Sequence, residues 1–450
     1  RGAGEGPMSR ARAFSVVLPM SLLLGGIASP CGAAPAEARP IGPRPIGPGP
    51  RPLPGFSVEV HRGLIRVHQR PITWSPWRGY IARAGRFPVY SRRPKGGGCP
   101  EPWYQLGPDA WACSGWLLPR GEGPTELQRL QDTWRPGPYL GARASRSSRV
   151  PFYPDLRSLS RGQAWWLRGD LGFVEASRIQ LGGQSYIVTN SGGYVSLKRV
   201  QPQAPVRMAS VTLARPGELP MVIALRETPI LRSAEKSLAS SGASLARYGA
   251  RKARRGPRGE AEAVFHEGEE HVLLASGELV RRSDVALASA PAAPSVRLGP
   301  KERWAHVDAA ERLVFAMEGA EPRRVMVASL GRNTPQGMFR VEQKLVFKDM
   351  QQRFGEDPFY LEAVPYVVFF KGDFAFHGAY WHDGLGSRAS HGCLNLGMED
   401  ARFLFDWLGP ELPPGFHSIY PTSLDPGALV HVQGRHRPRS WEPSSPRRPR

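Results

Sequence analysis

The chain has 450 residues and a formal net charge of +21, from 60 Lys and Arg against 39 Asp and Glu. At ~150 residues per domain, this length predicts about three domains and excludes a single small binding module. Gly and Pro number 51 and 46, which favours short strands and turns and excludes a coiled coil. Only one apolar run approaches membrane length, so a polytopic membrane protein is excluded as well.

Residues 8–36 have the pattern of a signal peptide. Two arginines between residues 9 and 12 precede an apolar run over 13–28, which is shorter than the ~20 residues needed to span a bilayer. We therefore expect export to the periplasm or cell envelope, with no stable membrane span. A lipoprotein anchored through Cys31 is the alternative.

The rest of the chain divides into parts that differ in proline content and in the predicted length of their strands. Eight prolines between residues 35 and 54 indicate an extended linker, and the following segments show short strands between Gly and Pro turns. The run from Trp103 to Leu117 resembles the closing strands of a bacterial SH3-like barrel. The expected parts are a Pro-rich linker at 37–74, an SH3-like module at 75–120, a second small β module at 135–205, a third at 208–292, a larger domain at 300–435 and a basic, disordered tail at 436–450.

The larger domain is less basic and has longer apolar strands. The pattern predicts a hairpin of strands at 364–370 and 374–376. Ala401, Leu404, Phe405 and Leu408 follow the spacing of a helix that is buried on one face. The fold class is therefore mainly β, with small β modules followed by a larger β domain that contains few short helices.

The cysteines suggest one disulfide and one separate thiol. Cys99 and Cys113 lie fourteen residues apart in one turn-rich segment, so an oxidising compartment makes a disulfide between them plausible. Cys393 then has no partner among the cysteines that remain after signal cleavage. Such a thiol in an exported protein is either buried and inert or reactive.

The residues around Cys393 favour a reactive thiol. Histidines occur at 377, 382 and 391, and a neighbouring base activates a thiol as a nucleophile. Gly392 lets the backbone turn and expose N–H groups, which stabilise an oxyanion. A zinc site built from the three histidines and Cys393 is the alternative, but the spacing matches no common zinc motif. We therefore predict no metal and no cofactor.

These motifs resemble the L,D-transpeptidases of the bacterial cell wall, the YkuD-type catalytic family. The family pattern is His-Gly, a spacer, and then Ser/Thr-His-Gly-Cys, a hydrophobic residue and Asn or Arg. His377-Gly378 and the run from Ser390 to Asn395 match it. The string Thr-Pro-Gln-Gly-Met-Phe at 334–339 matches a second family element. The resemblance covers residues 300–432.

The resemblance implies a mixed β-sandwich and a thioester mechanism. Cys393 would attack the carbonyl of the third stem-peptide residue, and His377 would act as general base and then as general acid. The backbone carbonyl of Gly378 would hold the other imidazole nitrogen, and the N–H groups of Gly392 and Cys393 would form the oxyanion hole. Ser390, His391 and Asn395 would shape the pocket or bind the donor stem. Tyr380 and Trp381 lie on the spacer between His377 and Ser390, where they either bind substrate as part of a lid or pack against the flank of the site.

The resemblance leaves several outcomes open. The implied function is an exported transpeptidase that removes the terminal D-Ala of a tetrapeptide stem and forms 3→3 cross-links. Alternatives within the family are an L,D-carboxypeptidase and an enzyme that attaches proteins to peptidoglycan. An alternative from another class is a non-catalytic wall-binding or sensor protein.

The expected partners are peptidoglycan stem peptides. Five basic residues between Arg251 and Arg258 lie among Gly, Ala and Pro with little aromatic interleaving, so we expect a solvated loop and no nucleic acid partner. Basic segments of the chain are candidates for contact with anionic envelope polymers.

Overall fold

The computed structural model describes residues 51–434 of the chain, apart from short gaps at 62, 135, 145–148, 216, 235–236, 332, 353–356 and 388–391. The predicted signal peptide and the basic tail lie outside the described residues, as do Ser390 and His391. Within the described part, no helix has both the length and the apolar character needed to cross a membrane.

The first module consists of short antiparallel strands. Its strands are β1 (Ser57–Val60), β2 (Ile65–His68), β3 (Trp77–Ile81), β4 (Arg86–Pro88), β5 (Ser91–Arg93), β6 (Trp103–Gly107), β7 (Ala110–Cys113) and β8 (Leu117–Arg120). The predicted linker boundary at residue 74 is wrong, because β1 and β2 already belong to this module. Val58 and Val60 alternate with a less buried residue, as do Ile65 and Val67, and this period of two is typical of a strand. The SH3-like character of the module stays a prediction.

A disulfide closes one side of the first module. Cys99 and Cys113 are joined, with their Cα atoms 5.8 Å apart. The bond links the turn before β6 to the last residue of β7. Trp103, at the start of β6, is 1% exposed, and its indole N–H donates to the Gly96 carbonyl over 2.9 Å. The structure therefore contains the predicted pairing, next to the largest buried ring of this module.

The second module joins the sheet of the larger domain. Its elements are α1 (Leu130–Thr133), β9 (Tyr139–Ala144), β10 (Val150–Tyr153), α2 (Leu156–Ser160), β11 (Trp165–Leu167), β12 (Gly169–Leu181), β13 (Gln184–Thr189), β14 (Tyr194–Ser196) and β15 (Gln201–Pro202). Strand β12 pairs in parallel with β31 (Phe359–Lys371), with Asp170 opposite Phe359 and Gly172 opposite Leu361. Tyr360 of β31 also packs into the core of this module.

The third module also joins a sheet of the larger domain. Its strands are β16 (Ser210–Thr212), β17 (Met221–Ala224), β18 (Thr228–Ala234), β19 (Ser237–Leu245), β20 (Ala250–Lys252), β21 (Ala263–His266), β22 (Glu269–Leu273), β23 (Leu279–Arg281) and β24 (Val285–Ala288). Strand β16 pairs antiparallel with β27 of the larger domain, with Val211 opposite Val325. The first strand of the predicted third module therefore extends the sheet of the larger domain.

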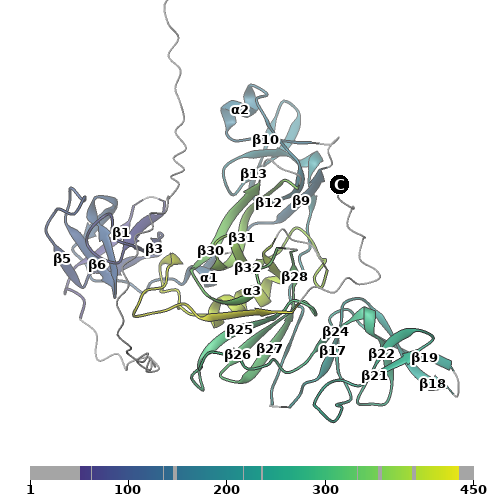
Figure 1. The fold of residues 1–450 in the computed structure, drawn as a ribbon. Coiled ribbons are helices and arrows are strands. Elements are labelled where there is room, and N and C mark those ends of the chain that lie inside the picture. The colour runs from purple at the N-terminus through teal and green to yellow at the C-terminus, as the bar shows by residue number, and fades with distance from the viewer. Residues whose placement is uncertain are drawn as a thin grey trace, which may run out of the picture. The chain divides into compact units, whose positions relative to one another are not determined.

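The larger domain is a β-sandwich (Figure 1). Its remaining elements are β25 (Arg303–Asp308), β26 (Leu313–Glu318), β27 (Glu321–Val327), β28 (Ser329–Leu330), β29 (Gly337–Arg340), β30 (Gln343–Gln352), β32 (Phe374–Gly378), β33 (Leu394–Leu396), α3 (Met398–Trp407), β34 (Phe416–Ile419) and β35 (Leu429–Gln433). One sheet has the order β16-β27-β26-β25-β35-β29, and β28, β33, β32, β31, β30 and β34 pair in the other. The predicted hairpin is confirmed, because Lys371 of β31 lies opposite Phe374 of β32.

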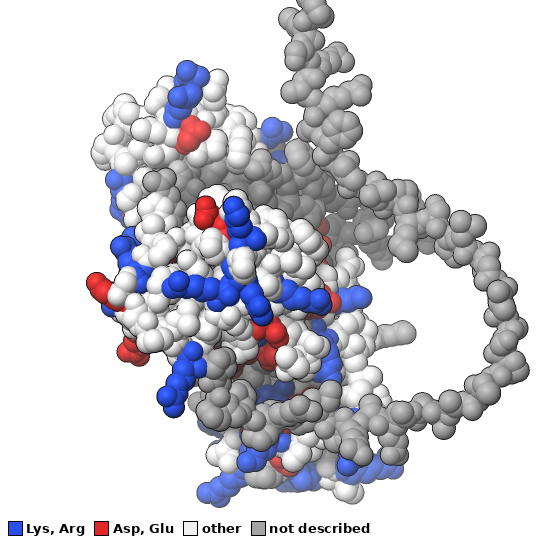
Figure 2. Space-filling model, turned by 90° about the vertical axis from the view of Figure 1, so that its left-hand side faces the viewer, with Lys and Arg blue, Asp and Glu red and all other residues white. Residues whose placement is uncertain are grey.

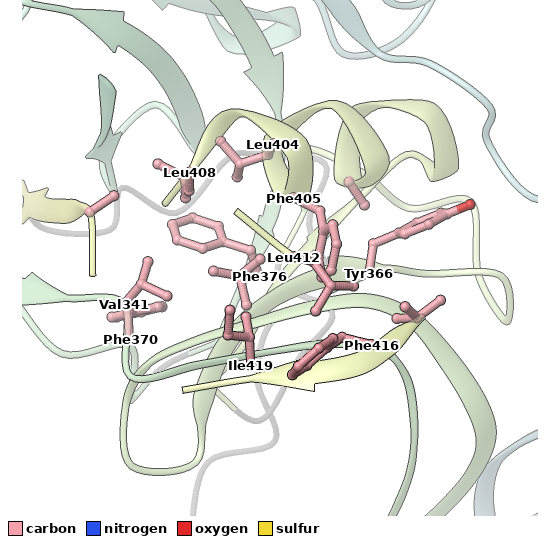
Figure 3. Packing of buried hydrophobic residues seen from close by; sticks show 14 of the residues in the cluster. Val341, Tyr366, Phe370, Phe376, Leu404, Phe405, Leu408, Leu412, Phe416 and Ile419 are labelled. Atoms are coloured by element: carbon pink, nitrogen blue, oxygen red, sulfur yellow. The ribbon is translucent and has the colours of Figure 1, made fainter. Parts of the chain in front are cut away.

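Helix α3 packs against the main core of the sandwich. Leu404, Phe405 and Leu408 point toward Phe376 and Phe370 of the sheet (Figure 3). All five side chains are at most 1% exposed, and burial of each contributes ~1.5–3 kcal/mol. The predicted helix with one buried face is therefore confirmed, and it packs against β32.

A buried carboxyl group lies where the second module meets β31. Glu362 is 0% exposed. Its carboxylate accepts hydrogen bonds from the Ser191 hydroxyl, the Tyr360 hydroxyl at 3.2 Å and the Val174 N–H at 3.4 Å. Burial raises the pKa of Glu362 from an ordinary value of 4.5 to about 7, because a charged carboxylate is poorly solvated there.

Glu362→Gln should remove part of the pH dependence of stability. The unfolded chain releases this proton near pH 4.5 and the folded protein near pH 7, so the free energy of unfolding falls as the pH rises between these values. At ~1.4 kcal/mol per pKa unit, the loss is on the order of 3 kcal/mol. Urea unfolding at pH 5 and pH 7.5 measures it, with Glu126→Gln as a control at an exposed carboxylate. An identical pH dependence in wild type and Glu362→Gln would contradict the prediction.

Candidate active site

The parallel pair β32 and β33 brings the predicted base and nucleophile to one side of a sheet. His377 lies opposite Asn395, and Phe376 lies opposite Leu394. Side chains of paired residues point to the same face, and successive residues alternate. Phe376 and Leu394 face the main core, so His377 and Asn395 face the other way. Cys393 directly precedes Leu394 and packs in the separate cluster on that second side.

His377 is held as a neutral base. Its side chain is buried, and Nδ1 lies 3.2 Å from the Gly378 carbonyl oxygen. A carbonyl oxygen only accepts, so Nδ1 carries the proton and Nε2 keeps its lone pair. Burial lowers the pKa of His377 to about 4. The contact with Gly378 that the family resemblance implies is therefore present, and the imidazole is ready to accept a proton at neutral pH.

Cys393 is a protonated thiol at rest. Its Sγ donates to the Asp373 carbonyl oxygen over 3.4 Å. Burial raises the pKa of the thiol to about 11, and the nearby Asp373 carboxylate acts in the same direction. A thiolate–imidazolium pair is therefore disfavoured. Nucleophilic attack requires the thiol to lose its proton as the new bond forms, which is the task of a general base.

Thr334 orients the peptide bond that precedes the nucleophile. Its hydroxyl donates to the Gly392 carbonyl oxygen over 2.8 Å. The carbonyl and the following N–H point in opposite directions in a trans peptide, so the N–H of Cys393 points away from Thr334. Gly392 also has no room for a side chain, since an added Cβ would come within 2.5 Å of the Phe374 ring. The sequence identified the turn at 334–339 but not this hydrogen bond.

His382 and Asn395 form a polar pair beside His377. The side-chain amide of Asn395 lies 2.7 Å from Nε2 of His382, and the Gly384 N–H donates to Nδ1 over 3.2 Å. Asn395 is 1% exposed, so it is placed to hold His382 rather than to meet solvent. Burial lowers the pKa of His382. His382 therefore connects the segment after β32 to β33.

The two aromatic residues predicted to bind substrate differ in position. The Trp381 ring lies 5.7 Å from the His377 ring, and its side chain is partly exposed. Tyr380 is 1% exposed, and its ring stacks on Tyr139 with centroids 4.4 Å apart. The expectation that Tyr380 contacts substrate needs correction, because its ring is enclosed by packing. The burial of Tyr380 depends on Tyr139, which is distant in the sequence, and local sequence patterns do not indicate this contact.

The zinc alternative takes its ligands from His377, His382, His391 and Cys393. Among the residues that the structure describes, no three His, Cys, Asp or Glu side chains are grouped as metal ligands. His391, which the zinc alternative requires, lies outside them, as does the predicted pocket residue Ser390.

Comparison with known proteins identifies the domain that carries this site. Residues 302–432 match the model of the L,D-transpeptidase catalytic domain, YkuD. This match includes His377, Cys393 and Thr334. A search of curated protein sequences finds no match to the chain.

Similar solved structures are L,D-transpeptidases of mycobacteria. L,D-transpeptidase 1 of Mycobacterium tuberculosis is 20% identical, with 39% of this chain and 83% of that chain covered and a TM-score of 0.23. L,D-transpeptidase 3 of the same organism, solved with a faropenem-derived adduct, is 20% identical, with 38% and 77% covered and a TM-score of 0.24. An L,D-transpeptidase of Mycobacterium smegmatis is 18% identical, with 51% and 100% covered and a TM-score of 0.24. The family match carries the assignment: residues 302–432 match the L,D-transpeptidase catalytic domain of the YkuD family.

Proposed function

We propose that this protein is an exported peptidoglycan L,D-transpeptidase with Cys393 as its nucleophile. It releases the terminal D-Ala of a tetrapeptide stem and forms 3→3 cross-links. The observation that carries the proposal is the shared side of β32 and β33 within the matched domain, on which a neutral imidazole and a protonated thiol both lie. General base catalysis requires these protonation states.

The acylation step uses the two side chains and one backbone N–H. The Cys393 sulfur bonds to the carbonyl carbon of the third stem residue, while its proton passes to Nε2 of His377. The carbonyl oxygen gains the electron pair and is stabilised by the N–H of Cys393, which Thr334 orients through the preceding peptide bond. The carbon–nitrogen bond to D-Ala then breaks, and the imidazolium returns its proton to the departing amine.

The second step consumes the thioester. The side-chain amine of another stem attacks the same carbonyl carbon and loses a proton to His377. The carbon–sulfur bond breaks, and that proton returns to the Cys393 sulfur, so the enzyme is regenerated. Water in place of the amine yields a tripeptide, which is the L,D-carboxypeptidase outcome.

Two further observations support export and an envelope partner. The disulfide between Cys99 and Cys113 fits an oxidising compartment. Lys and Arg side chains gather on one face (Figure 2), and long-range attraction to anionic envelope polymers follows from such a charge. The exposed basic residues of the first module are Arg66, Arg70, Arg83, Arg92, Arg93, Lys95 and Arg120.

The proposed function is tested with protein that lacks residues 1–36 and a purified disaccharide-tetrapeptide. We expect mass spectrometry to detect released D-Ala and a dimer that lacks one D-Ala. Cys393→Ala should abolish both products, and His377→Gln should lower the rate about 10²–10⁴-fold, the usual contribution of a general base. Tripeptide monomer without dimer would establish the carboxypeptidase alternative. No D-Ala release from folded protein would overturn the proposal in favour of a binding or sensor protein.

The reactivity of Cys393 should follow the ionisation of a partly buried thiol. With a pKa of about 11, the thiolate fraction grows about tenfold per pH unit up to pH 10, and alkylation follows the thiolate. We therefore expect the rate of iodoacetamide labelling, measured by intact mass, to rise continuously from pH 7 to pH 10. Labelling should be absent in Cys393→Ala. A plateau between pH 6 and pH 8 would indicate a preformed ion pair and contradict this prediction.

Thr334→Val should lower kcat while leaving KM nearly unchanged. The substitution keeps the shape of the side chain but removes the donor to the Gly392 carbonyl. Because the oxyanion contact matters chiefly in the transition state, we expect a loss of about tenfold to a hundredfold in D-Ala release. Thr334→Ser retains the hydroxyl and should preserve most of the rate. Wild-type kcat in Thr334→Val would show that the hydrogen bond has no role in catalysis.

A further inference from the structure

The spacer between the two halves of the active site lacks regular secondary structure over residues 379–387. It leaves β32 directly after His377 and Gly378. Trp381 and His382 of this spacer contact the His377 ring and the Asn395 amide. The position of the spacer therefore sets what surrounds the proposed base. A segment without its own hydrogen-bond ladder depends on its neighbours for a defined position.

One end of the spacer is anchored in the second module. The Tyr380 ring stacks on Tyr139 of β9 with an interplanar angle of 19°, and its hydroxyl donates to the backbone carbonyl of Glu362 on β31 of the catalytic domain over 2.5 Å. Strand β12 closes the same space at Gly172. A Cβ added there would come within 2.8 Å of both Cε2 and the hydroxyl oxygen of Tyr380. Only glycine leaves room for this ring.

The part of the second module that contacts Tyr380 is itself fixed to the catalytic domain. Strand β12 pairs in parallel with β31 at the level of Gly172 and Leu361. The neighbouring Glu362 accepts hydrogen bonds from Ser191 and Val174 of the second module. Backbone pairing and buried side-chain bonds together leave the module little freedom to slide along β31.

The other end of the spacer is anchored in the third module. The Arg247 guanidinium donates to the Asp383 carbonyl oxygen over 2.5 Å, and the Tyr248 hydroxyl donates to the same oxygen over 3.1 Å. Arg247 also lies 3.4 Å from the Asp383 carboxylate. Leu225 packs against Gly386, where an added Cβ would come within 2.6 Å of its methyl group.

The catalytic domain holds the spacer between these two anchors. Arg312 is 0% exposed and donates to the Gly386 carbonyl over 2.7 Å. The Ser329 hydroxyl donates to the Gly384 carbonyl over 2.7 Å. The spacer is thus held from three sides, and two of the three belong to segments outside the matched catalytic domain.

We propose that the second and third modules are positioning elements of the active site, which hold the spacer at Tyr380 and at Asp383 so that Trp381 and His382 enclose His377. This inference rests on the proposed function, because it treats His377 as the base. Strands and turns outside the matched catalytic domain then help to orient the residues around His377.

The test uses one variant in each module and a matched control on each. Gly172→Ala fills the space of the Tyr380 ring, and Arg247→Ala removes the donor to Asp383. Arg178→Ala on β12 and Arg232→Ala on β18 remove exposed ion pairs with Glu175 and Glu278, respectively. All are compared in the protein that lacks residues 1–36, by thermal melting, by hydrogen exchange of the 379–387 peptide and by D-Ala release.

We expect Arg247→Ala to melt within the range of its control and Gly172→Ala to melt lower, because the added methyl group meets a buried ring. Both variants should exchange faster in the spacer and lose roughly tenfold to a hundredfold in kcat, the scale of a small misplacement of catalytic groups. In a Trp381→Ala background, the same substitutions should add little further loss, because they act through the spacer. The controls should match wild type in all three measurements.

Each outcome bears on one proposal. Unchanged exchange and unchanged kcat in a folded module variant would overturn the positioning role. If Gly172→Ala does not fold, Arg247→Ala decides the question, since its side chain lies at the surface. If wild type releases no D-Ala, the proposed function fails, and the exchange of the spacer still decides whether the modules hold it.

Discussion

The active site depends on the register of one parallel strand pair. With His377 opposite Asn395, the polar side chains share one face, and Phe376 and Leu394 share the other. A slip of one residue would move these apolar side chains out of the main core and place the imidazole in it, so the core enforces the register. The packing of α3 against β32 therefore helps to hold the proposed base in place.

Burial has a second consequence on the reactive face. It lowers the pKa of His377 to about 4 and raises that of Cys393 to about 11, because both ions are poorly solvated there. The same desolvation that makes the resting pair unreactive strengthens every electrostatic contact with a developing oxyanion. In the mechanism that we propose, proton transfer and bond formation then belong to one step.

The second and third modules are structurally continuous with the catalytic domain. Strands β12 and β16 continue its two sheets, and Tyr139 and Arg247 reach the segment beside His377. The spacer has few backbone hydrogen bonds of its own, so contacts from distant segments are a physical requirement for a defined site. The positioning role that we propose for the two modules needs no ligand.

The sequence by itself predicted the chemistry that we propose, because the residues assigned to it lie in short strings whose types and spacing carry the signal. His377, Gly378 and Cys393 were predicted from it, as were the hairpin into β32 and the buried face of α3, since alternation and helical periodicity are local. The predicted end of the linker was wrong because the alternating strand that contains Val58 begins shortly after the prolines at 52 and 54. Only the tertiary structure decided the roles of Tyr380, Glu362 and Asp383, whose partners lie up to 188 positions away for Glu362 and 136 for Asp383, because long-range packing leaves no local pattern.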